Sequence, residues 1–309
     1  MNFAFVGAGA VGGYYGAMLA RSGSQVSFVA RGAHRDAIAE RGISILSDAV
    51  GSFTAKVAAE SDPARIGPVD VAVLAVKTYD NDTAIPLLTA LVGPKTVVLT
   101  LQNGVDSAEE VAAVVGADAT IGGSTYIATA IDSPGVIRQT GTHRRIVLGE
   151  VRGTPVAVSD RVRAIEAVMK AADIHAEAVP DARHAVWEKF TYLAPFAAFT
   201  GAARLPIGPL WADAHTRAMF LDAIAEVAAV ARAHGIPLPA DHKDRIDTYV
   251  AKLPPSTRSS LLIDLQQGKR IEVEALQGSV VRRGKAVGVP TPVMAALYAV
   301  LKPHANGAA

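Results

Sequence analysis

The chain has 309 residues, of which 50% are apolar and 19% are charged, and its formal net charge at pH 7 is +1. This length favours two domains with sizeable cores. A charge so close to zero gives no reason to expect nucleic acid or an acidic membrane surface as a partner. The chain has no cysteine, which excludes disulfides, thiolate metal sites and a thiol nucleophile.

Signals for export or membrane insertion are not apparent in the sequence. Met1 leads directly into an expected strand without a basic leader, so we expect no signal peptide. No apolar run approaches the roughly 18 residues that a membrane span needs. The sequence therefore predicts a cytoplasmic protein without a membrane partner.

The first thirty-one residues have the pattern of a strand, a glycine-rich turn, a helix and a second strand. The strands are expected at residues 2–6 and 25–30, and the helix at residues 11–21. The turn has the spacing G-x-G-x-x-G, which in this context indicates dinucleotide binding. Its residues are Gly7, Ala8, Gly9, Ala10, Val11 and Gly12.

The glycines of this turn have separate expected roles. The first permits the tight turn, the second lets the backbone approach a pyrophosphate, and the third lets the helix pack close to the strand. The helix N-terminus adds N–H groups and a partial positive charge. The alternative, a glycine-rich loop without a ligand, is disfavoured by the order of strand, turn and helix.

Arg31 follows the second strand, where units selective for NAD usually carry Asp or Glu. An arginine near this position suits the 2′-phosphate of NADP. We therefore expect NADPH rather than NADH as the cofactor. The alternative is a solvent-exposed arginine that has no ligand.

Two further apolar runs, residues 70–76 and 96–101, are typical of buried parallel strands. Lys77 follows the first run, and Asn103 follows the second. Ligands of doubly wound sheets bind beyond the carboxyl ends of the strands. Together with the glycine turn and Arg31, these positions predict one cofactor site along a single edge of the sheet.

The sequence changes character near Pro180-Asp181, where alternating strands and helices give way to helices alone. We therefore predict an α/β protein with two domains. Residues 1–180 form a Rossmann-type doubly wound sheet that binds NADP, and residues 181–309 form an all-α substrate and catalytic domain. The helices of the second domain are expected at residues 183–200, 214–234, 242–253, 270–283 and 291–301.

Lys189 is the most suggestive polar residue of the helical half. Apolar residues at 187, 190, 194 and 198 form a core stripe at helical spacing, whereas Lys189 falls on another face with Leu193 and Phe196. A lysine on a helix is usually a solvated charge. Its apolar neighbours favour a functional role, because burying an ammonium group is costly.

The chain resembles the ketopantoate reductase (2-dehydropantoate 2-reductase) family along nearly its whole length. The motifs that carry the resemblance follow the family's order and approximate spacing. They are Gly7–Gly12, Arg31, Val76-Lys77, Leu101-Gln102-Asn103-Gly104, Pro134-Gly135, Trp187-x-Lys189-Phe190, Ser259-Ser260, Asp264, Arg270 and Glu272. The resemblance implies a Rossmann domain followed by a helical domain.

The resemblance also implies roles for individual residues. Lys189 matches the proton donor that hydrogen-bonds the substrate carbonyl, and Glu272 matches a carboxylate that orients Lys189 or a ribose hydroxyl of the cofactor. Ser260 matches a substrate-binding hydroxyl. Asn103 is expected to touch both substrate and cofactor, and Ala128 the cofactor. A lysine with an ordinary pKa of about 10.4 is protonated at neutral pH, as a proton donor requires.

Three departures from the family pattern concern the substrate. The family carries asparagines at the positions of Leu193, Ala197 and Ile207, and these hold the polar groups of ketopantoate. An unmatched buried polar group costs roughly 1–3 kcal/mol. Replacement contacts are expected from Tyr192, Thr200 or Arg204, of which the arginine suits a carboxylate.

The leading function is therefore NADPH-dependent reduction of a 2-oxo acid, with ketopantoate reduction to pantoate in pantothenate biosynthesis as the first choice. One alternative is a D-2-hydroxyacid dehydrogenase for branched or aromatic 2-oxo acids. A more remote one is a dinucleotide-binding sensor without turnover. We expect no metal site, because the eight histidines show no metal-binding motif. An alanine-rich helical domain is compatible with a homodimer.

Overall fold

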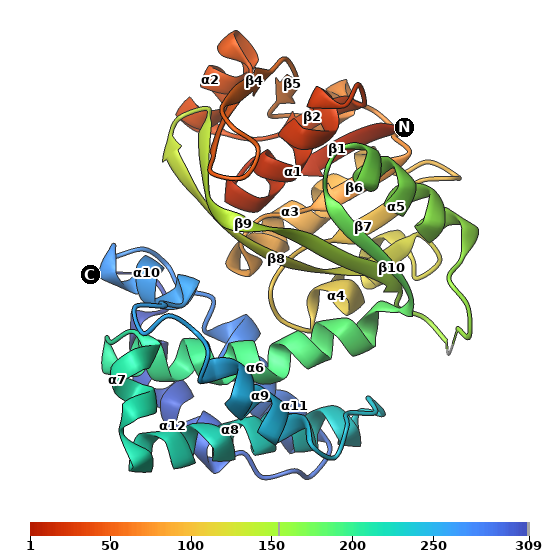
Figure 1. The fold of residues 1–309 in the computed structure, drawn as a ribbon. Coiled ribbons are helices and arrows are strands. Elements are labelled where there is room, and N and C mark those ends of the chain that lie inside the picture. Colours follow the sequence, from red (N-terminus) through yellow and green to blue (C-terminus); the bar gives the residue numbers. More distant parts are fainter. Residues whose placement is uncertain (154, 308–309) are drawn as a thin grey trace. The chain divides into compact units, whose positions relative to one another are not determined.

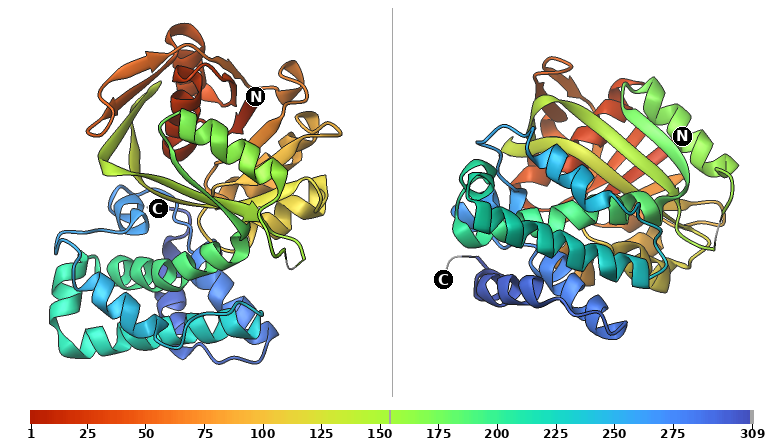
Figure 2. Two further views of the ribbon diagram at one scale, coloured as in Figure 1. Left: turned by 45° about the vertical axis from the view of Figure 1, so that its right-hand side comes forward. Right: turned by 60° about the horizontal axis from the view of Figure 1, so that its bottom comes forward.

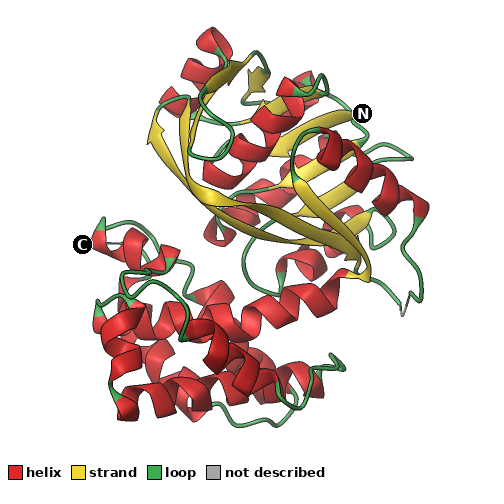
Figure 3. Ribbon diagram, in the orientation of Figure 1, coloured by secondary structure: helices red, strands yellow, loops and turns green. Residues whose placement is uncertain are grey.

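The first part of the chain contains a mixed β-sheet, and the rest of the chain is helical (Figures 1 and 3). The structure is a computed structural model that describes residues 1–153 and 155–307. It divides into two compact units. The first unit comprises Met1–Gln102 and Ser107–Ala185, and the second comprises Asn103–Asp106 and Val186–Ala309.

The strands of the first unit lie in the order β4-β3-β9-β8-β7-β6-β1-β2-β5, with β10 paired to β9. Their bounds are β1 Asn2–Val6, β2 Gln25–Val29, β3 Ile43–Ser47, β4 Phe53–Ala55, β5 Ala58–Glu60, β6 Val71–Leu74, β7 Val97–Thr100, β8 Thr120–Ser133, β9 Val136–Glu150 and β10 His175–Asp181. Strands β2, β1, β6, β7 and β8 pair in parallel, whereas β8 and β9 form a long antiparallel pair. Figure 2 shows these strands side by side.

The alternation along β1 explains why helices cover both faces of the sheet. Phe3 and Phe5 belong to the apolar cluster that contains residues of α1 and α5, whereas Ala4 and Val6 belong to the cluster with residues of α4. Successive strand residues point to opposite faces, so both faces of β1 are buried. The helices of this unit are α1 Ala10–Arg21, α2 Gly32–Arg41, α3 Asn81–Ala84, α4 Ser107–Val115 and α5 Asp160–Ala171. The predicted fold class is confirmed.

The second unit is helical and has its own core. Its helices are α6 Ala182–Ala203, which begins in the first unit, α7 Ile207–Ala212, α8 Ala214–Ala233, α9 His242–Val250, α10 Ser260–Gln266, α11 Ser279–Ala286 and α12 Pro292–Leu301. Trp187, Phe190, Ala194 and Ala198 of α6 are buried in that core, as the predicted stripe requires. No helix of residues 1–153 and 155–307 is both long and apolar enough to cross a membrane.

The predicted helix at residues 270–283 is only partly correct. The segment becomes helical at Glu274, where a π-helix (η4, Glu274–Gly278) leads into α11. Before it, the Ile271 N–H donates to the carbonyl of Ala305 at 3.1 Å. This contact with the distant end of the chain holds the backbone outside a helix, so tertiary structure overrides local propensity.

Candidate functional site

The glycine turn connects β1 to α1 as predicted. Gly7 has φ +104°, which favours glycine, and its N–H donates to Val29 O at 3.0 Å. A Cβ on Gly12 would lie 2.2 Å from Gly7 O, so this position brings the helix against the turn. A Cβ on Gly9, in contrast, would meet no atom of the described residues beyond its immediate chain neighbours within 4 Å. The turn is therefore closed on its packed side and open at Gly9.

This turn fits the diphosphate of a dinucleotide. Gly9 is the N-cap of α1, and the first helical turn contains no acidic residue. A helix N-terminus presents N–H groups that lack intrahelical partners together with a partial positive charge, and both favour a phosphate. The open space at Gly9 is where a backbone without a side chain permits the closest approach.

His34, which the sequence analysis missed, supports this turn. The Gly135 N–H donates to His34 Nδ1 at 3.1 Å. Since Nδ1 accepts, the ring proton lies on Nε2, which donates to Ala8 O at 2.8 Å. The imidazole therefore links the glycine turn to the turn between β8 and β9. The only sequence signal for His34 was its position three residues after Arg31.

The other predicted cofactor residues lie in the following places. Arg31 is exposed and is the N-cap of α2, directly beyond β2. Lys77 is the N-cap of the short 3₁₀ turn that follows β6. Ala128 is an exposed residue of β8 at a register shift in its pairing with β9. Since β1, β2 and β6 are parallel, the glycine turn, Arg31 and Lys77 follow strand ends at one edge of the sheet.

Lys189 of α6 is brought together with Asn103 in the second unit. The Lys189 ammonium (Nζ) donates to the Asn103 carboxamide oxygen (Oδ1) at 3.0 Å. Burial lowers the pKa of Lys189 to about 8, and the charge of Glu272 opposes this shift. Glu272 is itself only 6% exposed. A partly desolvated ammonium thus lies within electrostatic range of a buried carboxylate and in contact with an amide.

Such an arrangement can perform acid catalysis. An ammonium with a pKa near neutrality donates a hydrogen bond to a carbonyl oxygen, stabilises the negative charge that develops there and transfers a proton. The neighbouring amide oxygen orients the ammonium, and the carboxylate favours its charged form. The family resemblance predicted roles for Lys189, Asn103 and Glu272, but the sequence could not show that the three side chains interact.

The predicted substrate residue and the three departures from the family pattern lie on different helices, α6, α7 and α10. Ser260 is exposed at the first position of α10. Leu193 packs against the core of the second unit, while Ala197 and Ile207 are each 1% exposed. The three positions where the family has asparagine are therefore apolar and packed.

The three residues proposed to replace the family's asparagines differ in whether their polar groups are available to a substrate. Thr200 is fully buried, and its hydroxyl donates to Phe196 O at 2.6 Å and contacts the Ser259 hydroxyl at 2.7 Å. These bonds commit Thr200 to the protein interior. The Tyr192 ring stacks on the Phe196 ring, with 5.1 Å between the ring centroids. Arg204 is exposed beyond the last turn of α6, and its φ is +58°.

No group of acidic residues and histidines in residues 1–153 and 155–307 could hold a metal ion.

Two family models match the chain. Residues 3–153 match the model described as ketopantoate reductase PanE/ApbA, and residues 181–305 match the model described as ketopantoate reductase PanE/ApbA C terminal. The 2-dehydropantoate 2-reductase of Mesorhizobium japonicum is 31% identical over 98% of this chain and 97% of the relative.

Solved structures show the same similarity. The PanE/ApbA family ketopantoate reductase of Ralstonia eutropha JMP134 superposes with a TM-score of 0.88 and is 33% identical, with 98% of both chains covered. A D-mandelate dehydrogenase in complex with NADH and anilino(oxo)acetate has a TM-score of 0.86 at 20% identity, again with 98% of both chains covered. At that identity the second likeness concerns the fold alone.

Proposed function

The chain belongs to the ketopantoate reductase family, and we propose that it reduces 2-dehydropantoate (ketopantoate) to pantoate with NADPH. It is an oxidoreductase that uses a nicotinamide dinucleotide and acts on a small molecule. One observation carries the proposal: Lys189 Nζ donates to Asn103 Oδ1 at 3.0 Å, within range of the buried Glu272. We assign cofactor binding mainly to residues 1–180 and catalysis mainly to residues 181–309, with Asn103 and Glu272 as the exceptions.

In the proposed mechanism, a reduced nicotinamide dinucleotide would, when bound, supply the hydride for the C2 carbonyl of the 2-oxo acid. Lys189 hydrogen-bonds the carbonyl oxygen, stabilises the developing alkoxide and donates the proton to it. Asn103 orients the ammonium, and Glu272 favours its charged form. The glycine turn at residues 7–12, together with Arg31, Lys77 and Ala128, would hold the cofactor, and Glu272 would also contact its ribose. Ser260 would bind the substrate hydroxyl.

Substitution of Arg31 tests the preference for NADPH. We expect Arg31→Ala to raise KM for NADPH about 10- to 100-fold, because a charge-assisted contact with the 2′-phosphate is lost, and to leave KM for NADH nearly unchanged. Initial rates with both cofactors measure this. Arg41→Ala is the matched control, because Arg41 is an exposed arginine at the other end of α2. An equal rise for both cofactors would contradict the assignment.

The substrate is tested by comparing ketopantoate with 2-oxoisovalerate, which has a hydrogen in place of the hydroxymethyl group and therefore lacks its hydroxyl. A site that pairs this hydroxyl should favour ketopantoate by about 10⁴ in kcat/KM, and Ser260→Ala should reduce the ratio. The apolar Leu193, Ala197 and Ile207 favour the second candidate, a D-2-hydroxyacid dehydrogenase for branched or aromatic 2-oxo acids. A ratio near one, together with high rates on such acids, would select that candidate. The homodimer and the cytoplasmic location stay predictions.

A further inference from the structure

A four-residue segment that follows β7 packs with the helices of the second unit. This segment, Asn103–Asp106, clusters with Val186–Ala309. Val105 packs against the core of the second unit. Gly104 has φ +95°, and a Cβ there would lie 2.9 Å from Ala275 O. The backbone of the segment is therefore in close contact with η4.

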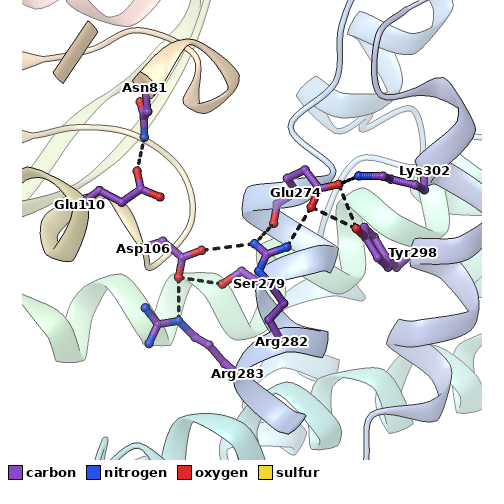
Figure 4. Close-up of polar contacts among 9 residues, drawn as sticks. All are labelled: Asn81, Asp106, Glu110, Glu274, Ser279, Arg282, Arg283, Tyr298 and Lys302. Carbon is purple, nitrogen blue, oxygen red and sulfur yellow. Dashed lines mark hydrogen bonds and ion pairs between the residues drawn. The ribbon is translucent and has the colours of Figure 1, made fainter. Parts of the chain in front are cut away.

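Asp106 ends this segment in a set of polar bonds to α11. Its Oδ1 accepts from Arg283 Nε at 2.7 Å and from the Ser279 hydroxyl at 3.0 Å. Its Oδ2 lies 3.9 Å from Arg282 Nη2. The Asp106 and Arg283 side chains are only 22% and 15% exposed. Figure 4 shows the Asp106 carboxylate between the two arginines and the serine.

Arg283 also contacts α6, the helix that contains Lys189. The Arg283 guanidinium lies over the Trp187 ring, 5.8 Å from its centroid. Trp187 precedes Lys189 by two residues on α6. The bonds of Asp106 therefore fix one end of the segment whose other end, Asn103, contacts Lys189.

We propose that Asp106 is a positioning residue, whose bonds to Arg283 and Ser279 hold the 103–106 segment so that Asn103 meets Lys189. This inference rests on the proposed function for its kinetic consequence. A lysine side chain is long and rotatable, so its direction depends on a fixed acceptor. Asn103 is such an acceptor only while its own backbone is held, and Asp106 holds it through charge-assisted bonds. The contact is thus set by a residue that touches neither substrate nor cofactor.

A double-mutant cycle tests this assignment. We expect Asp106→Asn to lower kcat for ketopantoate by about 10- to 100-fold through a misplaced ammonium, with a smaller effect on KM for NADPH, which is assigned mainly to the glycine turn and Arg31. Ser279→Ala, which removes only one neutral bond, should have a smaller effect in the same direction. In the Asn103→Ala background, Asp106→Asn should lower kcat no further, because residues that act through one contact are not additive. An equal loss in both backgrounds would overturn the proposal.

Glu274→Gln is the matched control. The Glu274 carboxylate accepts hydrogen bonds from Arg282 at 2.9 Å, from Tyr298 and from Lys302. Among the contacts drawn in Figure 4, no bond joins Glu274 directly to the 103–106 segment. We expect this variant to keep the kcat of the wild type. A loss equal to that of Asp106→Asn would show a general effect of charge in the second unit and overturn the assignment.

A second measurement is independent of turnover. Nuclear magnetic resonance of ¹³C-labelled lysine, with Lys189→Arg for assignment, follows the titration of Lys189. Asp106→Asn should lower its pKa below the wild-type value of about 8, because the ammonium loses an acceptor, and Glu274→Gln should not. An unchanged pKa in Asp106→Asn would overturn the proposal. If the wild type reduced no 2-oxo acid, the proposed function would fail while this titration still decided the role of Asp106.

Discussion

Replacement of Lys189 by alanine is expected to lower kcat for the 2-oxo acid by about 10²- to 10⁴-fold, the usual contribution of a positioned general acid. The cofactor should still bind normally, because the glycine turn and Arg31 belong to the first unit. Stopped-flow or steady-state kinetics measures the first effect, and a fluorescence titration with NADPH measures the second. Lys189→Arg should also be poor, because a planar guanidinium does not reproduce a compact ammonium.

The pH dependence of the wild type should identify the same group. The pKa of Lys189 is lowered to about 8, so the ammonium is present below this pH and is lost above it. We therefore expect the rate of reduction to fall as pH rises through about 8. Lys189→Ala should lack this limb of the profile.

The control for Lys189 is Lys285→Ala, which removes an exposed lysine in the last turn of α11. It should leave both kcat and the pH profile as in the wild type. If Lys189→Ala kept full activity, the assignment of the proton donor would be wrong. If the wild type itself reduced no member of a broad panel of 2-oxo acids while binding NADPH, the chain would be a dinucleotide sensor rather than a reductase.

Local patterns were sufficient to predict most of the fold. The predicted strands at residues 2–6 and 25–30 are β1 and β2, and the predicted helix at residues 214–234 is α8. In each case the periodicity of apolar residues and the punctuation by glycine or proline agree with the final packing. Such agreement between local and global preference is typical of sequences that specify one structure.

Elements that depend on tertiary contacts were missed. Helix α7, Ile207–Ala212, contains Gly208 and Pro209, which local rules treat as breakers. The helix forms because Ile207 N–H donates to Thr257 O and Gly208 N–H to Pro255 O, both at 2.9 Å. A Cβ on Gly208 would lie 2.6 Å from Pro255 Cβ, so the glycine permits this close packing. None of these partners is near in sequence.

The same limit applies to the candidate site. Helical spacing placed Lys189 away from the core stripe, where a solvated charge is the ordinary expectation. Its Nζ instead donates to Asn103, which is 86 residues earlier in the chain. Its charge also interacts with Glu272, whose segment is not helical as predicted. Only the family resemblance connected these residues before the structure did. His34 and Asp106 were outside the motifs. His34 was marked only by its position three residues after Arg31, and Asp106 had no signal that local reasoning could use.

Alanine substitutions at Gly9 and Gly12 should separate two roles of the glycine turn, which are close packing at Gly12 and phosphate binding at Gly9. In Gly12→Ala, the new Cβ would lie 2.2 Å from Gly7 O and 2.9 Å from Ala75 Cβ, so the turn must shift. We expect a loss of about 1–3 kcal/mol in the free energy of unfolding, as for other overpacked sites, together with at least a tenfold loss of NADPH affinity, because a displaced turn no longer aligns its N–H groups with the phosphates. Denaturant unfolding without cofactor and a binding titration measure the two effects.

Gly9→Ala is the matched variant, because its Cβ meets open space and its φ of −63° suits alanine. Its stability without cofactor should fall by only about 0.5–1 kcal/mol, because alanine is a poorer N-cap residue than glycine but its Cβ causes no clash. Its NADPH affinity should nevertheless fall, because the methyl group occupies the side from which the diphosphate would approach the backbone. Wild-type affinity in Gly9→Ala would mean that the phosphates bind elsewhere, and the open side of the turn would then need another explanation.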